Sequence, residues 1–423
     1  MISSRFLSAI FSAGVALMAF GAVYWPTGLG YLAASPGVLL ITVSVALLPL
    51  TPKPLRSRTS LNAWRLLGYG VLISALSVLI FGWSPLYASK SLSLLLLSAV
   101  WIAPLLCIDH LQKRHLRRAL IAAVGICFVG YLLGDIVPGS MPAAISSMAF
   151  GGGYDDYLHT RARGFMQENS HFAALLGRYL LILFLLNEAS RTYSARRLTL
   201  FMVALATLLA FLGSKGSAVS IAAAVLSVSL TRRQLPYLVI LAPLLWWVGE
   251  TQFEALSYDI ENFTSTSTRL TLALGAIAAM LSNPLGYGYY GFYGAIQKFG
   301  GWSMGWLGER LPLVTTELTE IVEDLINVSA KSTLLDFGIV WGLPFVLILI
   351  GLFRRINHSD PRARVGLVYL TLSALATSGH DSISFFLGLA VLVRLFPKLA
   401  PGRGVVHGKR DLRAQPDREA QPT

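Results

Sequence analysis

The chain has 423 residues, of which 55% are hydrophobic and only 13% are charged, and its formal net charge is +13. This number of charged residues is too small to cover the surface of a soluble protein of this size. The composition therefore excludes a soluble protein and indicates a membrane protein. Most Lys and Arg residues lie in short segments between apolar runs, as in the loops of multi-pass membrane proteins. The positive net charge therefore does not predict nucleic acid as a partner.

Apolar runs of roughly 14 to 22 residues recur along nearly the whole chain, and a bilayer core requires about 20 residues per helix. The sequence therefore predicts an all-α, polytopic transmembrane bundle of about twelve spans. A cleaved signal peptide is the alternative for the first run, but no small-residue cleavage site precedes the second. The predicted spans are 6–25, 31–50, 66–83, 91–107, 119–138, 172–187, 198–213, 217–230, 236–249, 332–353, 365–378 and 381–396.

The basic residues are divided unequally between the two sides of this predicted bundle. One set of segments carries 24 of the 34 Lys and Arg residues, and the positive-inside rule makes that side cytoplasmic. We therefore expect a multi-pass protein of the bacterial inner membrane with both termini in the cytoplasm. The basic set comprises the N-terminus, the loops 51–65, 108–118, 188–197, 231–235 and 354–364, and the tail from residue 397.

Two predicted extracytoplasmic segments are much longer than the other loops, namely residues 139–171 and 250–331. Long loops on a rigid scaffold commonly carry function, so we expect any chemistry to reside in these two segments of the transmembrane domain, 1–396. The remaining part, 397–423, is polar and contains proline, which predicts a disordered cytoplasmic tail.

The first long loop ends with two arginines, Arg161 and Arg163, followed by Gly164 just before a predicted span. Arginine binds phosphate through two parallel hydrogen bonds, and the start of a helix adds amide donors, so this pattern predicts an anion site. The alternative is a pair of arginines that anchor the chain among lipid headgroups. The positive-inside bias argues against that alternative.

The second long loop contains a short apolar helix that starts at Arg269, ends near Ser282 and precedes a turn rich in glycine and tyrosine. We expect this helix to lie in the membrane interface or over the bundle. The aromatic residues of the turn, Tyr289 and Tyr290 among them, would then lie at the level of headgroups or sugars. They are predicted to bind substrate, with a structural aromatic belt as the alternative.

Farther along this loop, Glu317, Glu320 and Asp324 recur at a spacing that places them on one face of a helix. Such carboxylates can supply a general base for a sugar hydroxyl, and a solvated acidic face is the alternative. Lys215, in the turn GSKGS, is a further extracytoplasmic cation and a candidate substrate contact. That turn lacks the spacing of a phosphate-binding P-loop.

Arg178 lies inside a predicted span, and Asp336 and Asp381 lie near the ends of others. Ionisable residues in spans usually face the bundle interior, so Arg178 is either a substrate contact or part of an internal ion pair. The cysteines and histidines have no metal-ligand spacing, so neither a metal nor another cofactor is predicted.

Residues 120–355 resemble the O-antigen ligase and polymerase superfamily, the Wzy-type membrane glycosyltransferases that act on undecaprenyl-pyrophosphate-linked sugars. The resemblance rests on four features in order. They are the RxxG motif at 161–164 followed by QEN and a span, an SKG turn where the family often has SRG, the Arg269 helix ending in NPLGYG, and the span LLDFGIVWGLPF after the long loop.

The resemblance implies a GT-C-like fold in which Arg161, with Arg163 close by, and Arg269 hold the pyrophosphate of the lipid-linked donor. The implied reaction is inverting glycosyl transfer to a hydroxyl of an acceptor glycan or glycolipid, without a metal. Ligases of the family commonly carry His-Asn before the span, whereas alignment on Gly338 places Asn327 and Val328 there. This departure favours a polymerase of O-antigen or exopolysaccharide repeat units.

The implied partners are the undecaprenyl-pyrophosphate-linked glycan, the acceptor, membrane lipids, and assembly proteins such as a flippase or a chain-length regulator. Three alternatives stay open. The first is an O-antigen ligase acting on lipid A-core or another acceptor. The second is a glycolipid transporter or flippase with Arg178, Asp336 and Asp381 along its path. The third is a noncatalytic assembly partner.

Overall fold

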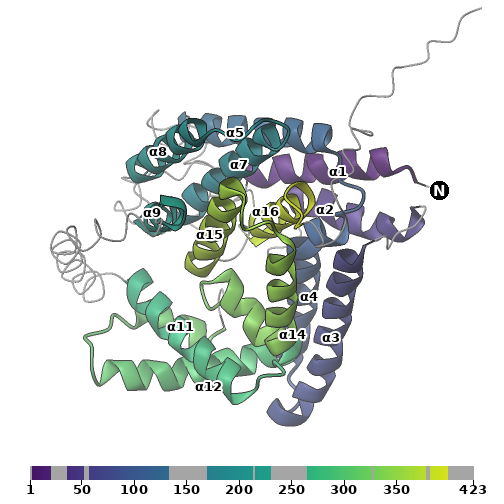
Figure 1. Ribbon diagram of the computed structural model, residues 1–423. Helices are drawn as coiled ribbons and strands as arrows, with labels where there is room; N and C mark the ends of the chain where they lie inside the picture. Colours follow the sequence, from purple (N-terminus) through teal and green to yellow (C-terminus); the bar gives the residue numbers. More distant parts are fainter. Residues whose placement is uncertain are drawn as a thin grey trace, which may run out of the picture.

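The computed structural model describes residues 2–20, 36–51, 57–132, 169–212, 215–229, 264–325, 328–377 and 382–398 (Figure 1). Within these residues all regular elements are helices, and the only β-type pairing is an isolated bridge between Ile356 and Pro397. The predicted all-α class is therefore confirmed for the described part of the chain. The tail at 399–423 lies outside it.

A helix coincides with each predicted span that falls within the described residues, whereas the span predicted at 236–249 lies outside them. The helices are α1 (Ser4–Leu17), η1 (Met18–Phe20), α2 (Pro36–Leu47), η3 (Leu48–Leu50), α3 (Arg58–Phe81), α4 (Pro85–Leu106), α5 (Lys113–Tyr131), α7 (Asn169–Glu188), α8 (Ala195–Phe211), α9 (Lys215–Ser229), α11 (Thr264–Ser282), α12 (Gly288–Gly308), α13 (Thr316–Glu323), α14 (Thr333–Arg355), α15 (Pro361–Ala376) and α16 (Ser382–Leu395).

Four of the described helices are long and apolar enough to cross a membrane, namely Arg58–Phe81, Pro85–Leu106, His171–Glu188 and Thr333–Arg355. Shorter apolar helices cover Ser4–Phe20, Pro36–Leu50 and Ser382–Leu395. The chain is therefore a membrane protein by composition and by helix length. The count of about twelve spans stays a prediction.

Local sequence signals set where several of these helices begin. The hydroxyls of Ser57, Ser84 and Ser332 each accept a hydrogen bond from a backbone amide in the first turn of the helix that follows. Asp360 caps α15 in the same way and is followed by proline at the first helical position. Such caps satisfy amides that lack partners inside the helix.

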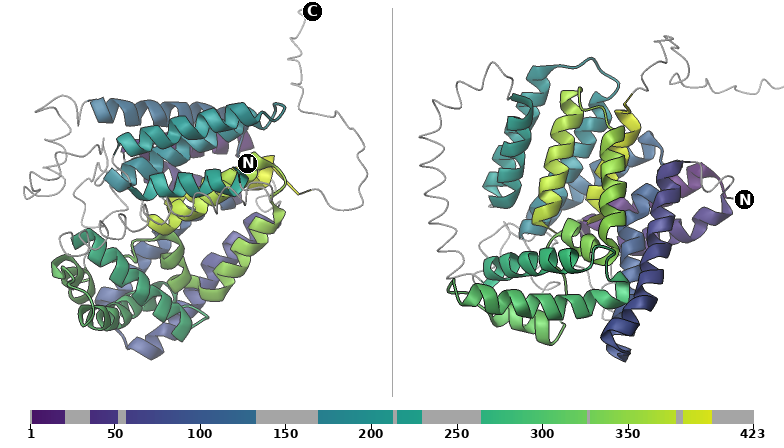
Figure 2. Two further views of the ribbon diagram at one scale, coloured as in Figure 1. Left: turned by 60° about the vertical axis from the view of Figure 1, so that its left-hand side comes forward. Right: turned by 60° about the horizontal axis from the view of Figure 1, so that its bottom comes forward.

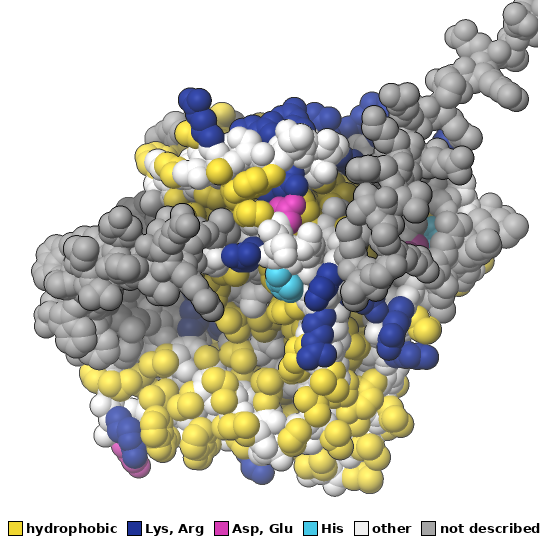
Figure 3. Space-filling model, viewed as in Figure 1, with side chains coloured by type: hydrophobic (Ala, Val, Ile, Leu, Met, Phe, Trp, Pro, Cys, Tyr) yellow, Lys and Arg dark blue, Asp and Glu magenta, His cyan; other side chains and the backbone are white. Residues whose placement is uncertain are grey.

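The helices pack in two groups. In one, α7 lies against α5, α15 and α16, while α9 lies between α8 and α15. In the other, α11 and α12 lie side by side, and α12 packs on α3 and α4 (Figures 1 and 2). The surface over α11, α12 and α14 is mainly hydrophobic on the face seen in Figure 3. Side chains along α3 such as Leu72, Leu79 and Ile80 are 61%, 82% and 63% exposed, as expected for contact with lipid.

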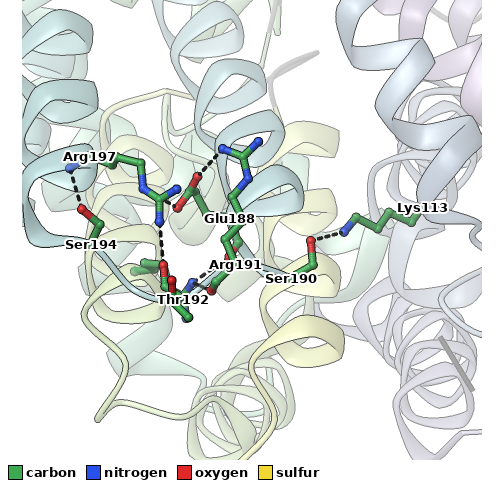
Figure 4. A network of polar contacts seen from close by, with 8 residues as sticks. Lys113, Glu188, Ser190, Arg191, Thr192, Ser194 and Arg197 are labelled. Carbon is green, nitrogen blue, oxygen red and sulfur yellow. Dashed lines mark hydrogen bonds and ion pairs between the residues drawn. The ribbon is translucent and has the colours of Figure 1, made fainter. Parts of the chain in front are cut away.

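Loops that the charge pattern predicts on the cytoplasmic side contact one another. Thr59 accepts a hydrogen bond from the Arg355 guanidinium at 2.8 Å, and the Ser57 amide donates to the Asp109 carboxylate at 2.9 Å. Lys113 donates to the Ser190 hydroxyl at 3.5 Å (Figure 4). The loops 51–65, 108–118, 188–197 and 354–364 therefore share one side, as the predicted alternation requires.

Glu188, at the end of α7, is the centre of the polar network on this side. Its carboxylate lies 3.3 Å from a guanidinium nitrogen of Arg191 and 3.4 Å from one of Arg197 (Figure 4). Its backbone carbonyl accepts a hydrogen bond from Arg362 at 2.7 Å, which joins the start of α15 to the end of α7. The glutamate neutralises part of a strongly basic surface and holds together Arg191, Arg197 at the start of α8 and Arg362 at the start of α15.

Asp360 supports Arg362 from the same side, with a 2.6 Å contact between its carboxylate and the guanidinium. Burial by itself would raise the pKa of the Asp360 carboxyl. The hydrogen bonds from the Arg362 side chain and backbone outweigh burial, so the pKa of Asp360 lies below its usual value. The carboxylate therefore stays ionised near neutral pH.

The helix α14 is broken in its middle, where Gly342 adopts φ 57° and ψ −142°. In an unbroken helix the Leu343 amide would bond to the Ile339 carbonyl. Here that amide donates to the Pro284 carbonyl at 2.7 Å, and the Ile339 carbonyl accepts from the Tyr287 amide at 2.8 Å. The turn between α11 and α12 thus satisfies both halves of the missing helical hydrogen bond.

Candidate functional site

Several candidate site residues lie outside what the structure describes. Arg161 and Arg163 fall in 133–168, so the predicted anion site in the first long loop has no described geometry. Lys215 is the first residue of α9 and Glu317 lies in the first turn of α13, but their side chains are not among those described. Their roles as substrate contact and carboxylate stay predictions.

Arg269 lies in the second turn of α11 and is half-buried. The helix ends at Ser282, as predicted, but it begins at Thr264, so Arg269 is inside it and not at its start. The neighbouring Ser267 is fully buried, and its hydroxyl accepts the Val314 amide at 3.3 Å. This contact holds the segment that leads into α13 against the first turn of α11.

The short helix α13 has one buried apolar face and one acidic face. Leu318 and Ile321 form the buried face and are 0% and 2% exposed. Glu320 and the C-cap residue Asp324 are both exposed, as the predicted helical face requires. Because α13 packs against α11 and α12, these exposed carboxylates belong to the same group of loop helices as Arg269.

The structure corrects the predicted surroundings of the tyrosines. Tyr289 and Tyr290 are 2% and 3% exposed, so neither ring is open to headgroups or sugars. They belong to the first turn of α12 rather than to a loop. Tyr290 donates to the Gly82 carbonyl and accepts from the Ser84 amide at 2.7 Å, which fixes α12 to the α3–α4 connection. The ring of Tyr289 meets Trp341 edge to face, with centroids 6.3 Å apart.

The glycines that led the sequence analysis to predict a turn here lie in α12 and allow close helix packing. Gly291 and Gly294 have no Cβ, so α12 approaches the side chains of Ser77 and Phe81 on α3 closely. The aromatic rings then bury large areas against neighbouring helices. A role for Tyr289 and Tyr290 in substrate binding stays untested, but it would require the helices to move apart.

Arg178 is fully buried, with a side chain surrounded by hydroxyl groups from two other helices. Its guanidinium donates to Ser373 at 2.8 Å, to Thr377 at 2.6 Å and to Ser384 at 3.2 Å. We call Arg178 with these three residues the hydroxyl cage. It joins α7 to the end of α15 and the start of α16, because each of these elements contributes a member.

The hydroxyl cage continues into a second group of buried hydroxyls at the start of α14. Thr333 donates to the Thr377 carbonyl at 2.8 Å and lies 2.9 Å from the Ser382 hydroxyl. The sequence predicted Arg178 to be a substrate contact or part of an internal ion pair, and it did not identify these hydroxyl partners. The available signal was serine or threonine repeated at helical spacing in apolar spans, as in Ser373 and Thr377.

Asp336 is 7% exposed and lies in the first turn of α14. Its carboxylate accepts the Ser329 hydroxyl at 2.8 Å and the Ala330 amide at 2.6 Å, so it shapes the segment that leads into the helix. Asp381, which the sequence places near the end of a predicted span, lies outside the described residues.

The described part of the chain contains no group of three or more His, Cys, Asp or Glu side chains arranged to hold a metal ion. In the long loop, the half-buried Arg269 on α11 lies on a helix that packs against α13, whose exposed acidic residues are Glu320, Glu323 and the C-cap residue Asp324. A guanidinium can stabilise phosphate charge, and a carboxylate can accept a proton from a hydroxyl. The hydroxyl cage lies in the other helix group, around α7, α15 and α16.

No protein-family model matches the chain. It is similar to an uncharacterised 49.5 kDa protein in the cps region of Klebsiella pneumoniae, with 27% identity over 214 residues. The matched part covers 48% of this chain and 48% of that protein, so the chain spans about half the length of the curated relative it matches. This similarity is consistent with a context of capsule polysaccharide synthesis, and it does not name a family.

Proposed function

We propose that this chain is a glycosyltransferase that polymerises undecaprenyl-pyrophosphate-linked repeat units of an O-antigen or exopolysaccharide. The reaction would occur at the extracytoplasmic face of the bacterial inner membrane. The observation that carries the proposal is the half-buried Arg269 on α11, beside the acidic helix α13 in the long loop. The similarity to a protein of a cps region supports the polysaccharide context.

In the proposed reaction, a hydroxyl oxygen of the acceptor glycan attacks the anomeric carbon of the donor. The bond from that carbon to the pyrophosphate oxygen breaks, and undecaprenyl pyrophosphate leaves with the electron pair. Arg269, together with Arg161, would stabilise the negative charge that develops on the leaving group. The proton of the attacking hydroxyl would pass to a carboxylate, for which Glu317, Glu320 and Asp324 are the candidates.

The test is elongation in vitro with purified protein in liposomes and a purified undecaprenyl-pyrophosphate-linked repeat unit. An ammonium cannot form two parallel hydrogen bonds with phosphate as a guanidinium does, so Arg161→Lys and Arg269→Lys should each lose most activity. Loss of one oriented donor costs about a hundredfold or more in rate.

Arg310 provides the matched control because it lies in the same long loop but at the exposed end of α12. Its guanidinium lies 4.2 Å from the ring centre of Trp306 and 3.3 Å from Glu309. Arg310→Lys should keep its activity within about twofold, as expected for an exposed pair. If the Arg161 and Arg269 variants behave like this control, the pyrophosphate assignment is wrong. Transfer to lipid A-core without elongation would instead identify a ligase.

A further inference from the structure

The first two turns of α5 carry a dense group of cations. Lys113, Arg114, Arg117 and Arg118 lie within the six residues KRHLRR, and all four side chains are exposed. We call these residues the α5 basic cluster. Side chains four residues apart lie on one face of a helix, and the cluster contains two such pairs of like charge, which destabilise a helix. The cluster is therefore unfavourable for folding unless an anion neutralises it.

The described part of the chain supplies no carboxylate to this cluster at ion-pair distance. Acidic residues of the neighbouring loops have other partners. The Asp109 carboxylate accepts the Ser57 amide at 2.9 Å, and Glu188 pairs with Arg191 and Arg197. The arginines beside Glu188 are thus neutralised within the protein, whereas the described residues leave the charge of the α5 basic cluster open to an external anion.

The cluster lies at one end of an exposed apolar stripe on the same helix. Ile121, Phe128 and Leu132 follow Arg114 and Arg118 at helical spacing and are 51%, 44% and 50% exposed. The helix packs on α1 and α7 and lies at the outer edge of its group (Figure 1). In a membrane protein, exposed apolar side chains along a helix contact lipid chains, and cations at the end of such a stripe reach the headgroups. The stripe and the cluster together match the two parts of one lipid molecule.

We infer that the α5 basic cluster binds the phosphate of an anionic phospholipid in the leaflet on the predicted cytoplasmic side. Guanidinium groups hold phosphate through two parallel hydrogen bonds, and clusters of cations beside a span attract anionic lipids. A lipid fits better than a soluble anion, because its acyl chains would lie on the apolar stripe that begins one turn away at Ile121. The proposed glycosyl transfer is not needed for this inference.

The test compares two brominated lipids as quenchers of a fluorophore beside the cluster. Ile121→Cys carries the label, in the full chain with Cys107 and Cys127 replaced by alanine, reconstituted into phosphatidylcholine vesicles. Brominated phosphatidylglycerol or brominated phosphatidylcholine is added at the same small mole fraction. Since bromine quenches only nearby fluorophores, excess quenching by phosphatidylglycerol measures its local enrichment. We expect enrichment of about threefold or more at low salt, and less at high salt because ions screen the attraction.

Two comparisons locate the effect at the cluster. Leu79→Cys, near the other end of α3 and 82% exposed in the wild type, should be quenched equally by the two lipids. Replacing the three arginines of the cluster by glutamine should abolish the excess quenching of the Ile121→Cys label. Replacing them by lysine, which keeps the charge, should preserve most of it. Arg196→Gln, which removes an exposed cation from α8, should leave the excess unchanged.

Equal quenching of the Ile121→Cys label by the two lipids would overturn the inference. Excess quenching that survives in the glutamine variant would overturn it as well, because the anionic lipid would then be held by other groups. The first comparison uses the unmodified cluster, so it stands even if the glutamine variant does not fold. Because activity is not measured, either outcome is distinct from failure of the proposed glycosyl transfer.

Discussion

The turn at residues 283–287 between α11 and α12, which we call the elbow, and the hydroxyl cage both bury polar groups among apolar helices, but they satisfy those groups by different means. At the elbow, backbone amides and carbonyls of α14 pair with backbone of the 283–287 turn, and glycines make the approach possible. In the cage, the charged side chain of Arg178 is held by three side-chain hydroxyls. The first arrangement depends on the absence of side chains, the second on their chemistry.

This difference predicts different sensitivities to mutation. A backbone arrangement should tolerate changes of the surrounding side chains but not the addition of a single Cβ. A side-chain arrangement should weaken by steps as hydroxyls are removed. The buried cage also leaves no exposed surface on Arg178, whereas Arg269 is half-buried and therefore partly accessible.

Gly342→Ala should have the largest effect. A Cβ at this position would lie 2.3 Å from the Pro284 carbonyl oxygen, and a φ of +57° with a ψ of −142° is strained for alanine. Strain and overpacking together should cost about 2 to 5 kcal/mol. We expect greatly reduced accumulation of folded protein and a lower melting temperature in detergent.

Gly351 provides the control for this change, because it lies in the same helix with nothing within 4 Å of an added Cβ. Gly351→Ala should be neutral or stabilise the helix by up to about 1 kcal/mol. Equal melting temperatures for Gly342→Ala and Gly351→Ala would show that the break in α14 is not maintained in the protein.

Arg178→Met should have the next largest effect, since it removes a fully buried side chain that three hydroxyls contact. Each buried polar group that loses its partner costs about 1 to 3 kcal/mol, although the hydroxyls can rotate toward their own helix carbonyls. Removing one hydroxyl with Thr377→Val should cost about 1 to 2 kcal/mol. The wild type should have the highest melting temperature, Thr377→Val an intermediate one and Arg178→Met the lowest.

Thr371→Val on the same helix is the matched control, because the Thr371 hydroxyl donates to the Leu367 carbonyl within α15. It should change the melting temperature least of the three. If Arg178→Met is as stable as wild type but loses activity, the cage is a binding site and not a structural one, and the contrast with the elbow fails.

The sequence predicted the elements of this fold better than their environments. The apolar runs predicted the helices, and the turn NPLGYG predicted the end of α11 at Ser282. The burial of Tyr289 and Tyr290 was not predictable, because it depends on α3, which is distant in sequence and offers Gly70 and Ser74 at the contact. The partners of Arg178 were missed for the same reason, since they come from α15 and α16.

The Asp360–Arg362 pair is a third way in which the chain satisfies polar or charged groups, here by an ion pair, and its loss should have the smallest effect. The carboxylate and guanidinium are 2.6 Å apart, and their side chains are 15% and 10% exposed. The cost of removing both charges from water offsets much of their attraction, so we expect a net contribution of about 1 kcal/mol. Because the pKa of Asp360 is lowered in the folded protein, its contribution is present above the usual pKa of an aspartate carboxyl and is lost as the pH falls through the lower, folded-state pKa. Asp360→Asn should therefore lower the melting temperature slightly at pH 7 and not at all at the acid end of the range.

Glu309→Gln, which affects the more exposed pair with Arg310, should show no such dependence on pH. A loss for Asp360→Asn that stays constant from pH 7 down to about 3 would mean that the cap contributes through its shape and not through its charge.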